Sequence, residues 1–88
     1  MQTTTLLSAG TSAAASDPVE IEDGQVITLT FIGEGKIMLL SVDDQGNEEP
    51  EENLTSTSAR SRQVAGPYRI RLRRSASDTA VGMKMFRS

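Results

Sequence analysis

The stretch Gln25-Val-Ile-Thr-Leu-Thr-Phe-Ile32 decides the fold class of this 88-residue chain. Its apolar residues Ile27, Leu29 and Phe31 alternate with threonines, which is the two-residue period of a β-strand that buries one face. The run is also rich in β-branched residues, whose stiff side chains favour strands. It therefore predicts a strand with these three side chains in the core.

Four further stretches have the pattern of strands. Val19 to Glu22 and Tyr68 to Arg73 alternate in the same way, and Lys36 to Val42 is more continuously apolar. Thr79 to Phe86 carries Val81, Met83 and Met85 on one side. Nowhere do apolar residues recur at helical spacing over ten or more positions. The pattern predicts an all-β fold: a small β-sandwich, jelly-roll-like or Ig-like, with six to eight short strands.

Turn residues and weakly patterned segments separate these strands. We expect a hairpin link at Gly33-Glu34-Gly35 and an acidic loop from Asp43 to Asn53. Between Leu54 and Val64 the alternation is weak, which predicts at most an edge strand. Gly82, inside the last strand, indicates a bulge or a close approach of two backbones.

The N-terminal segment differs in composition from the rest of the chain. Residues 1–17 are rich in Thr, Ser and Ala, carry one apolar pair at Leu6 and Leu7, and end at Asp17-Pro18. We interpret them as an extended N-terminal arm in front of a single β domain of residues 18–88. The arm is predicted to form either an added strand around Thr3 to Leu7 or a flexible tail that orders against a neighbour. We expect it to order on a partner instead of packing in its own core.

The core available to this domain is thin. Val, Ile, Leu and Phe total 19 of 88 residues, just above the level of about 20% at which charged chains tend toward disorder. We therefore expect marginal stability alone and a gain from a partner surface. The predicted core is Ile27, Leu29, Phe31, Met38, Leu40, Tyr68, Ile70 and Leu72.

Charge is divided between the two parts of the chain. Residues 1–53 hold eleven carboxylates against Lys36, a net charge of −10, and residues 54–88 hold eight cations against Asp78, a net charge of +7. The two parts add up to the −3 of the whole chain. Acidic and basic strands are expected to pair, either within the fold or between identical subunits.

The most distinctive local feature is the arginine row, Arg69, Arg71 and Arg73, on the strand that begins at Tyr68. Cations spaced two apart share one face of a strand, where they repel one another unless anions intervene. We expect them to meet Glu20 and Glu22 across a strand pair or a subunit boundary. The predicted interface residues are Leu6, Leu7, Glu20, Glu22, Arg69, Arg71 and Arg73.

Composition argues against enzyme chemistry. The chain has no His and no Cys, which are the usual neutral-pH base, thiol nucleophile and transition-metal ligands. The acidic turn from Asp43 to Glu49 suggests calcium, but its sixth position is Glu48, where an EF-hand loop needs Gly. We predict a solvated turn there, and a non-enzymatic protein with no catalytic residues, metal, cofactor or small-molecule substrate.

Membrane and nucleic-acid partners are not expected either. No apolar run approaches the roughly 18 residues that span a bilayer, and no Lys or Arg precedes Lys36 to begin an export signal. A basic strand can bind nucleic acid, but the chain has only Phe31, Tyr68 and Phe86 as stacking rings. Its acidic first half would also repel phosphate.

Several short motifs resemble those of small β-sandwich virion proteins of tailed bacteriophages. They are Thr-Leu-Leu-Ser-Ala from Thr5 to Ala9, Asp-Asp-Gln-Gly-Asn from Asp43 to Asn47, Gly-Pro-Tyr-Arg-Ile-Arg from Gly66 to Arg71, and Ala-Val-Gly from Ala80 to Gly82. The resemblance extends over nearly the whole chain. These families include head-decoration or cement proteins, head fibres, and small tail or connector components, none of which has a catalytic residue to carry over.

The resemblance implies a bacteriophage structural protein of the virion. The leading expectation is a capsid decoration or cement protein, made in the host bacterial cytoplasm, that binds the major capsid protein on the outer capsid surface as a homotrimer and stabilises the head. The alternatives are a tail or head-tail connector component, a carbohydrate-binding module for the host surface, and a nucleic-acid-binding β protein.

Overall fold

The computed structural model describes residues 2–87, and these form nine β-strands and no helix. The strands are β1 (Gln2–Gly10), β2 (Ala14–Ala15), β3 (Val19–Ile21), β4 (Val26–Gly33), β5 (Lys36–Val42), β6 (Glu48–Thr55), β7 (Ser61–Ala65), β8 (Tyr68–Arg74) and β9 (Val81–Arg87).

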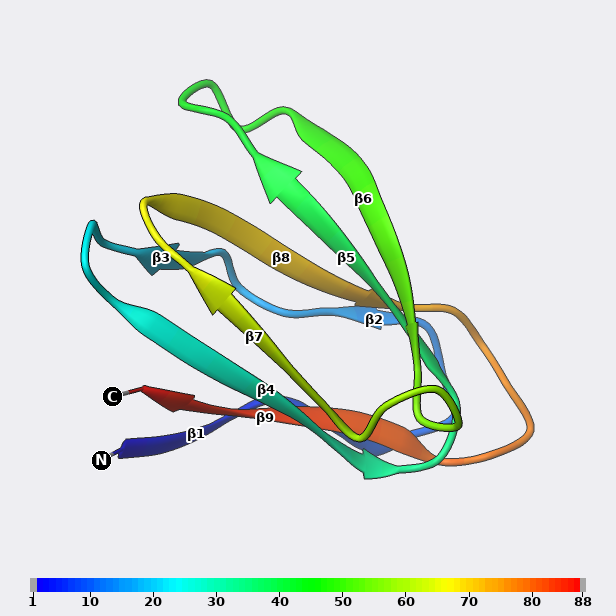
Figure 1. Ribbon diagram of the computed structural model, residues 1–88. Coiled ribbons are helices and arrows are strands. Elements are labelled where there is room, and N and C mark those ends of the chain that lie inside the picture. The colour runs from blue at the N-terminus through cyan, green and yellow to red at the C-terminus, as the bar shows by residue number, and fades with distance from the viewer. Residues whose placement is uncertain (1, 88) are drawn as a thin grey trace.

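The strands form two antiparallel sheets that pack against each other (Figure 1). Sheet A has the order β1-β9-β4-β7, and sheet B has the order β2-β8-β5-β6, with β3 paired to the same edge of β8 as β2. The predicted small β-sandwich is confirmed, with nine strands in place of six to eight. Both chain ends lie at one end of sheet A, because β1 pairs with β9 (Figure 1).

The core consists of one face from each sheet, as the alternation predicted. Ile27, Leu29 and Phe31 of β4 are at most 5% exposed, and Ile70 and Leu72 of β8 are fully covered. Tyr68 is half-buried and packs against this cluster. The cluster is Leu7, Val19, Ile21, Ile27, Leu29, Phe31, Ile37, Leu39, Leu54, Val64, Ile70, Leu72, Val81, Met83 and Met85.

Strand β5 turns toward the other sheet the opposite set of residues from the predicted one. Ile37 and Leu39 belong to the core cluster, whereas Met38 and Leu40 lie on the outer face of sheet B, where Leu40 stands opposite Arg71. The predicted burial of Leu40 is nevertheless confirmed, because this side chain is only 1% exposed, whereas Met38 is half-buried. Apolar residues occupy both the odd and the even positions of this run, so its pattern could not predict which face is buried. A shift of one residue exchanges the two faces of a strand.

The N-terminal segment is an integral edge strand of sheet A. Gln2–Gly10 pairs with β9, and Leu7 is a core residue at 5% exposure. The backbones approach closely: a Cβ added to Gly82 would lie 2.4 Å from the carbonyl oxygen of Leu7, which confirms the expected close contact at this glycine. The added strand, one of the two states predicted for this segment, is confirmed. The prediction that the segment orders on a partner instead of packing in its own core is wrong, because Leu7 belongs to the core cluster. One sandwich takes the place of an arm followed by a domain of residues 18–88.

The segment that pairs along one edge of β8 is interrupted at Asp17-Pro18. This interruption separates the two short strands β2 and β3. Between them lies Ser16, which is 3% exposed. Its N–H donates to the carbonyl oxygen of Leu72 at 2.9 Å, and its hydroxyl accepts from the N–H of Leu72 at 3.0 Å. A serine hydroxyl therefore completes the backbone pairing where proline interrupts the strand.

Strand β6 begins inside the segment that was predicted to be a loop. The turn is confined to residues 43–47, where an Asp43 carboxylate oxygen accepts from the Asn47 N–H at 2.8 Å. Glu48–Thr55 then pairs with β5 at the edge of sheet B. An edge strand tolerates acidic residues and Pro50, because one of its sides needs no backbone partner. The loop prediction is therefore wrong beyond Asn47.

The Gly33-Glu34-Gly35 link joins the two sheets and is not a hairpin. Strand β4 pairs with β7 and β9, whereas β5 pairs with β6 and β8. Gly33 has a φ of 75°, and a Cβ there would lie 2.3 Å from the carbonyl oxygen of Ala80, so the turn requires glycine. The expected edge strand between Leu54 and Val64 is confirmed as β7, which ends sheet A.

Arg74 is buried at 5% exposure, on the inward face of β8. Its Nε donates to the carbonyl oxygen of Ser12, and its Nη1 donates to those of Ser8 and Val81, each at 2.7 Å. One guanidinium thus ties β8 to β1, to the β1–β2 link and to β9. Its partners are neutral carbonyls, so the charge is solvated by backbone dipoles.

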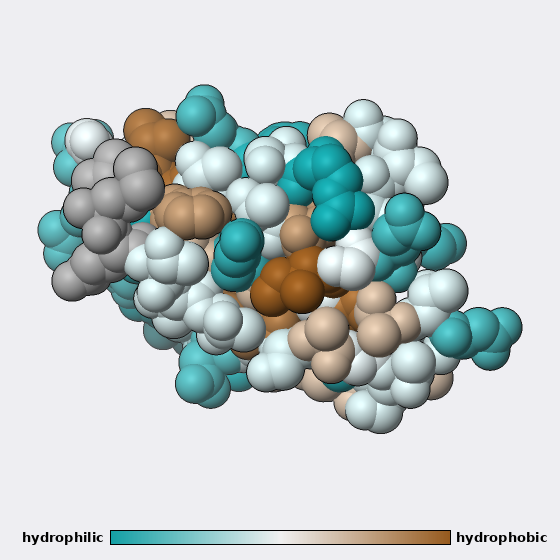
Figure 2. All heavy atoms as spheres, turned by 90° about the horizontal axis from the view of Figure 1, so that it is seen from below, coloured by the Kyte–Doolittle hydropathy of each residue, from teal (hydrophilic) through white to brown (hydrophobic). Residues whose placement is uncertain are grey.

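The outer face of sheet A is polar, with isolated apolar patches, as the view of that face in Figure 2 shows. Lys84 and Phe86 occupy its middle on β9, and threonines of β1 and β4 flank them in the ladders. The Lys84 ammonium lies 5.5 Å from the ring centroid of Phe86, within cation–π range.

Replacing Leu29 with Ala should destabilise the protein by about 2 to 5 kcal/mol, because Leu29 is fully buried and its removal leaves a cavity. Val26→Ala on the same strand, at 37% exposure, is the matched control and should cost about 1 kcal/mol or less. Urea denaturation measures both. Equal effects would contradict the assignment of faces on β4.

Arg74→Met should cost about 2 to 5 kcal/mol, because one buried and two partly buried carbonyl oxygens lose their donor. Amide hydrogen exchange should rise most in β1. Arg73→Met, on the outward face of the same strand, controls for loss of charge and should have a small effect. Unchanged exchange in β1 would show that this guanidinium does not hold the N-terminal strand.

Candidate functional site

The arginine row lies on the outer face of sheet B, as predicted, and ion pairs within the chain fix it. Arg69 donates from Nε and Nη2 to one carboxylate oxygen of Glu20, at 3.0 and 2.9 Å, across the β3–β8 ladder. Its Nη1 reaches the carbonyl oxygen of Asp43 at 3.3 Å. The predicted pairing of Arg69 with Glu20 is therefore present within one subunit.

Arg71 and Arg73 share a different carboxylate from the predicted ones. Glu48, at the start of β6, accepts from Nη1 of Arg71 at 2.9 Å and from Nη2 of Arg73 at 2.8 Å. Arg71 also donates from Nε to the carbonyl oxygen of Ser16 at 2.8 Å. The acidic strand β6 lies across β5 from the basic strand β8, so Glu48 is the anion that separates two neighbouring cations.

The remaining predicted interface residues are dispersed. Glu22 is exposed and makes no ion pair within residues 2–87. Leu6 is half-buried and packs on the core, and Leu7 is inside it, so Leu7 is not a surface residue. Glu48 was missed because it stood inside a presumed loop. The sequence did contain a clue to this residue: Glu48 belongs to the acidic part of the chain, which was expected to pair with the basic strand.

The contacts of Glu48 perturb its titration. The hydrogen bond from Arg71 is the largest influence, and with the charges of Arg71 and Arg73 it holds the pKa of the Glu48 carboxyl below its ordinary value. The folded state therefore favours the ionised form. This contribution to stability is present above the ordinary carboxyl range and is lost as the pH falls through the lowered pKa.

The acidic turn uses its own carboxylate. Asp43 accepts from the N–H groups of Gln45 and Asn47 and from the Asn47 side-chain amide at 3.1 Å, and hydrogen bonding from Asn47 lowers the pKa of Asp43. Within residues 2–87 no group of three or more His, Cys, Asp or Glu side chains is placed to hold a metal ion.

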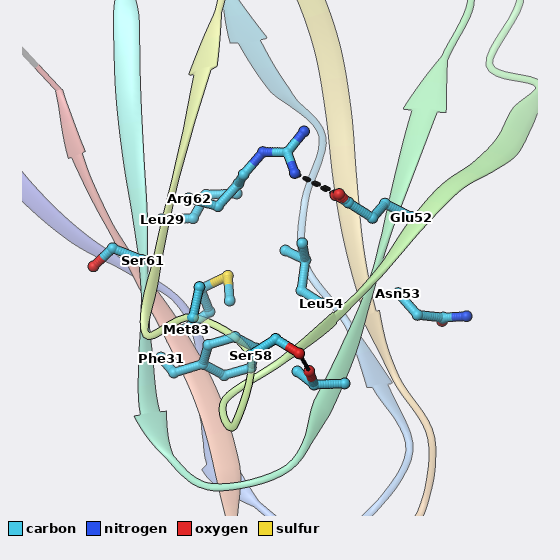
Figure 3. Close-up of a pocket in the computed structure, with 11 residues that line it drawn as sticks. Leu29, Phe31, Glu52, Asn53, Leu54, Ser58, Ser61, Arg62 and Met83 are labelled. Carbon is cyan, nitrogen blue, oxygen red and sulfur yellow. Dashed lines mark hydrogen bonds and ion pairs between the residues drawn. The ribbon is translucent and has the colours of Figure 1, made fainter.

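A cavity of about 150 Å³ opens between the edge strands β6 and β7 (Figure 3). Leu29, Phe31, Leu54 and Met83 form its apolar wall. In Figure 3 these side chains point into the space, and an ion pair between Arg62 of β7 and Glu52 of β6 spans the opening. Sequence analysis did not predict this site, because it depends on the splay of two strands that belong to different sheets.

Comparisons with known proteins add no identification. No protein-family model matches the chain, and no match was found among curated proteins or among solved structures. Residues 2–87 contain no helix with the length and apolar character needed to cross a bilayer.

Glu48→Gln should lower stability at neutral pH and have little effect in acid, because the ionised carboxylate is the form that Arg71 and Arg73 bind. The urea midpoints of wild type and Glu48→Gln measure this difference. They are compared from pH 7 down to below about pH 4, which is the ordinary pKa range of a carboxyl group. Glu49→Gln, at an exposed neighbour without an ion pair in residues 2–87, is the control. A pH-independent difference between wild type and Glu48→Gln would contradict the role of this carboxylate.

Proposed function

We propose that this protein is a non-enzymatic structural protein of a tailed-bacteriophage virion, and that it decorates the outer capsid surface by binding the major capsid protein and copies of itself. Its motifs resemble those of small β-sandwich virion proteins, and a β-sandwich is the fold of this chain. The proposed assembly state is a homotrimer.

The observation that carries the proposal is the charged outer face of sheet B. Three guanidinium groups are held in a row by Glu20 and Glu48, which leaves this face with an excess of one positive charge from these five residues. Because ion pairs and backbone acceptors already orient the arginines, little side-chain entropy is lost when a partner binds. Such fixed charge patterns suit recognition of a complementary protein surface.

The same contacts disfavour nucleic acid as the partner. Each guanidinium of the row already binds a carboxylate, and a phosphate would have to compete with that carboxylate. Proteins that bind nucleic acid mainly through phosphate contacts lose affinity steeply with salt. Retention on heparin at low salt that is lost at moderate salt would favour nucleic acid as the partner.

Mass spectrometry of purified phage particles tests the location. Decoration of the capsid lattice predicts on the order of hundreds of copies per particle, whereas a tail or connector component predicts about a dozen or fewer. Light scattering of the isolated protein tests the trimer. Absence of the chain from purified particles would refute the virion proposal.

Arg73→Gln should weaken attachment to particles that lack the protein by about tenfold or more, because an interface charge is lost. Folding should be nearly unchanged, since Arg73 is half exposed and Arg71 keeps its bond to Glu48. Lys84→Gln makes the same charge change on the outer face of sheet A and serves as the control. Co-sedimentation measures attachment, and equal attachment of both variants at low and physiological salt would exclude this face.

A further inference from the structure

The opening between β6 and β7 brings a guanidinium to the rim of an apolar cavity. Arg62 lies opposite Leu29 in the β4–β7 ladder, so its side chain leaves the inward face of β7 toward β6. There it meets Glu52, and the two side chains remain 51% and 36% exposed. Exposed ion pairs are weak, so this contact can be exchanged for another at small cost.

The nitrogen of Arg62 that faces the space is the one that binds Glu52. The contact with Glu52 uses Nη1 of Arg62 for both carboxylate oxygens. In Figure 3 the other terminal nitrogen points away from Glu52 and from the labelled apolar side chains. A carboxylate that enters the space can therefore bind Arg62 by taking Nη1 in place of Glu52.

The space below the rim fits one apolar group. Its volume is about 150 Å³, and Leu29, Phe31, Leu54 and Met83 line it. An apolar cavity of about this size in another protein stays dry and binds benzene. Filling it removes the apolar surface of the ligand from water and covers the little that Phe31 and Leu54 still expose, which supplies the driving force for binding.

We infer that this cavity is a binding site for a carboxylate that carries an apolar group about the size of a benzene ring. The ring occupies the space between Leu54, Met83 and Phe31, and the carboxylate takes Nη1 of Arg62 in exchange for Glu52. Such a ligand has two sources, a free aryl or alkyl carboxylate or the C-terminal residue of a partner protein. The inference does not depend on the proposed virion location.

Phenylacetate is the probe for the full ligand, with toluene as the ring alone and acetate as the anion alone. Titrations of the full chain are followed by methyl resonances of methionine and leucine in NMR. We expect phenylacetate to saturate the site in roughly the millimolar range or below. Met83 and Leu54 should shift, while the buried Met85, which does not line the cavity, serves as an internal control. Toluene and acetate should each bind at least tenfold more weakly.

Arg62→Gln separates the two halves of the site. It should lower the affinity for phenylacetate about tenfold and leave the affinity for toluene unchanged, because only the carboxylate contact is removed. Arg73→Gln, on the outer face of sheet B, is the matched loss of charge and should leave phenylacetate binding as in the wild type. Both substitutions are at exposed arginines, and urea midpoints confirm that the fold is kept.

A short peptide that ends in phenylalanine with a free carboxylate, and the same peptide as an amide, distinguish the sources. Binding of the acid form at least as tight as that of phenylacetate, with loss in the amide, identifies a chain terminus as the ligand. Binding of phenylacetate alone identifies a small molecule. Equal binding of toluene and phenylacetate, shifts away from Met83 and Leu54, or an unchanged affinity in Arg62→Gln would each overturn the inference.

Discussion

Burial of one apolar face per strand between two sheets is the constraint on which the rest of this structure depends. With only 19 Val, Ile, Leu and Phe residues among 88, most large apolar side chains are needed in a single layer. The N-terminal strand must therefore contribute Leu7, and β9 must contribute two methionines that fill irregular space. Because so little apolar surface remains, the outer faces are built mainly from charged and hydroxyl side chains.

Arginine side chains add hydrogen bonds between distant backbone segments to the stabilisation that the thin core provides. Arg74 joins three backbone segments from inside the sandwich, and Arg60 donates to the carbonyl oxygens of Gly33 and Phe31 at 2.8 and 3.2 Å. Arg87 links the end of β9 to the carbonyl oxygen of Glu20. A guanidinium can do this because it offers five donors in a fixed plane and keeps its charge at any physiological pH. Several arginines thus act as backbone crosslinks, and the arginine row and Arg62 form ion pairs.

The two surfaces proposed for recognition differ in how they arise. The arginine row follows from the alternation of residues along one strand. Carboxylates on β3 and β6 fix the orientation of its side chains. The cavity arises where β6 and β7, the last strands of their sheets, leave a space against core side chains. Its rim pair, Arg62 and Glu52, consists of inward-facing charges on edge strands, which also protect exposed sheet edges from pairing with other chains.

The sequence by itself determined the fold class and the strands whose two faces differ strongly. In β4 and β8 apolar and polar residues alternate without exception over the core-facing part, so periodicity predicted both the strand and its buried side. Only the tertiary structure decided the face of β5, the strand nature of β6, the choice between strand and tail for β1, and the link between sheets after β4. In these segments local composition is the same on both faces or mostly polar, and pairing with distant strands selects the conformation. The partners of the arginines and the cavity were beyond prediction for the same reason, since each joins residues from strands that only the folded chain brings together.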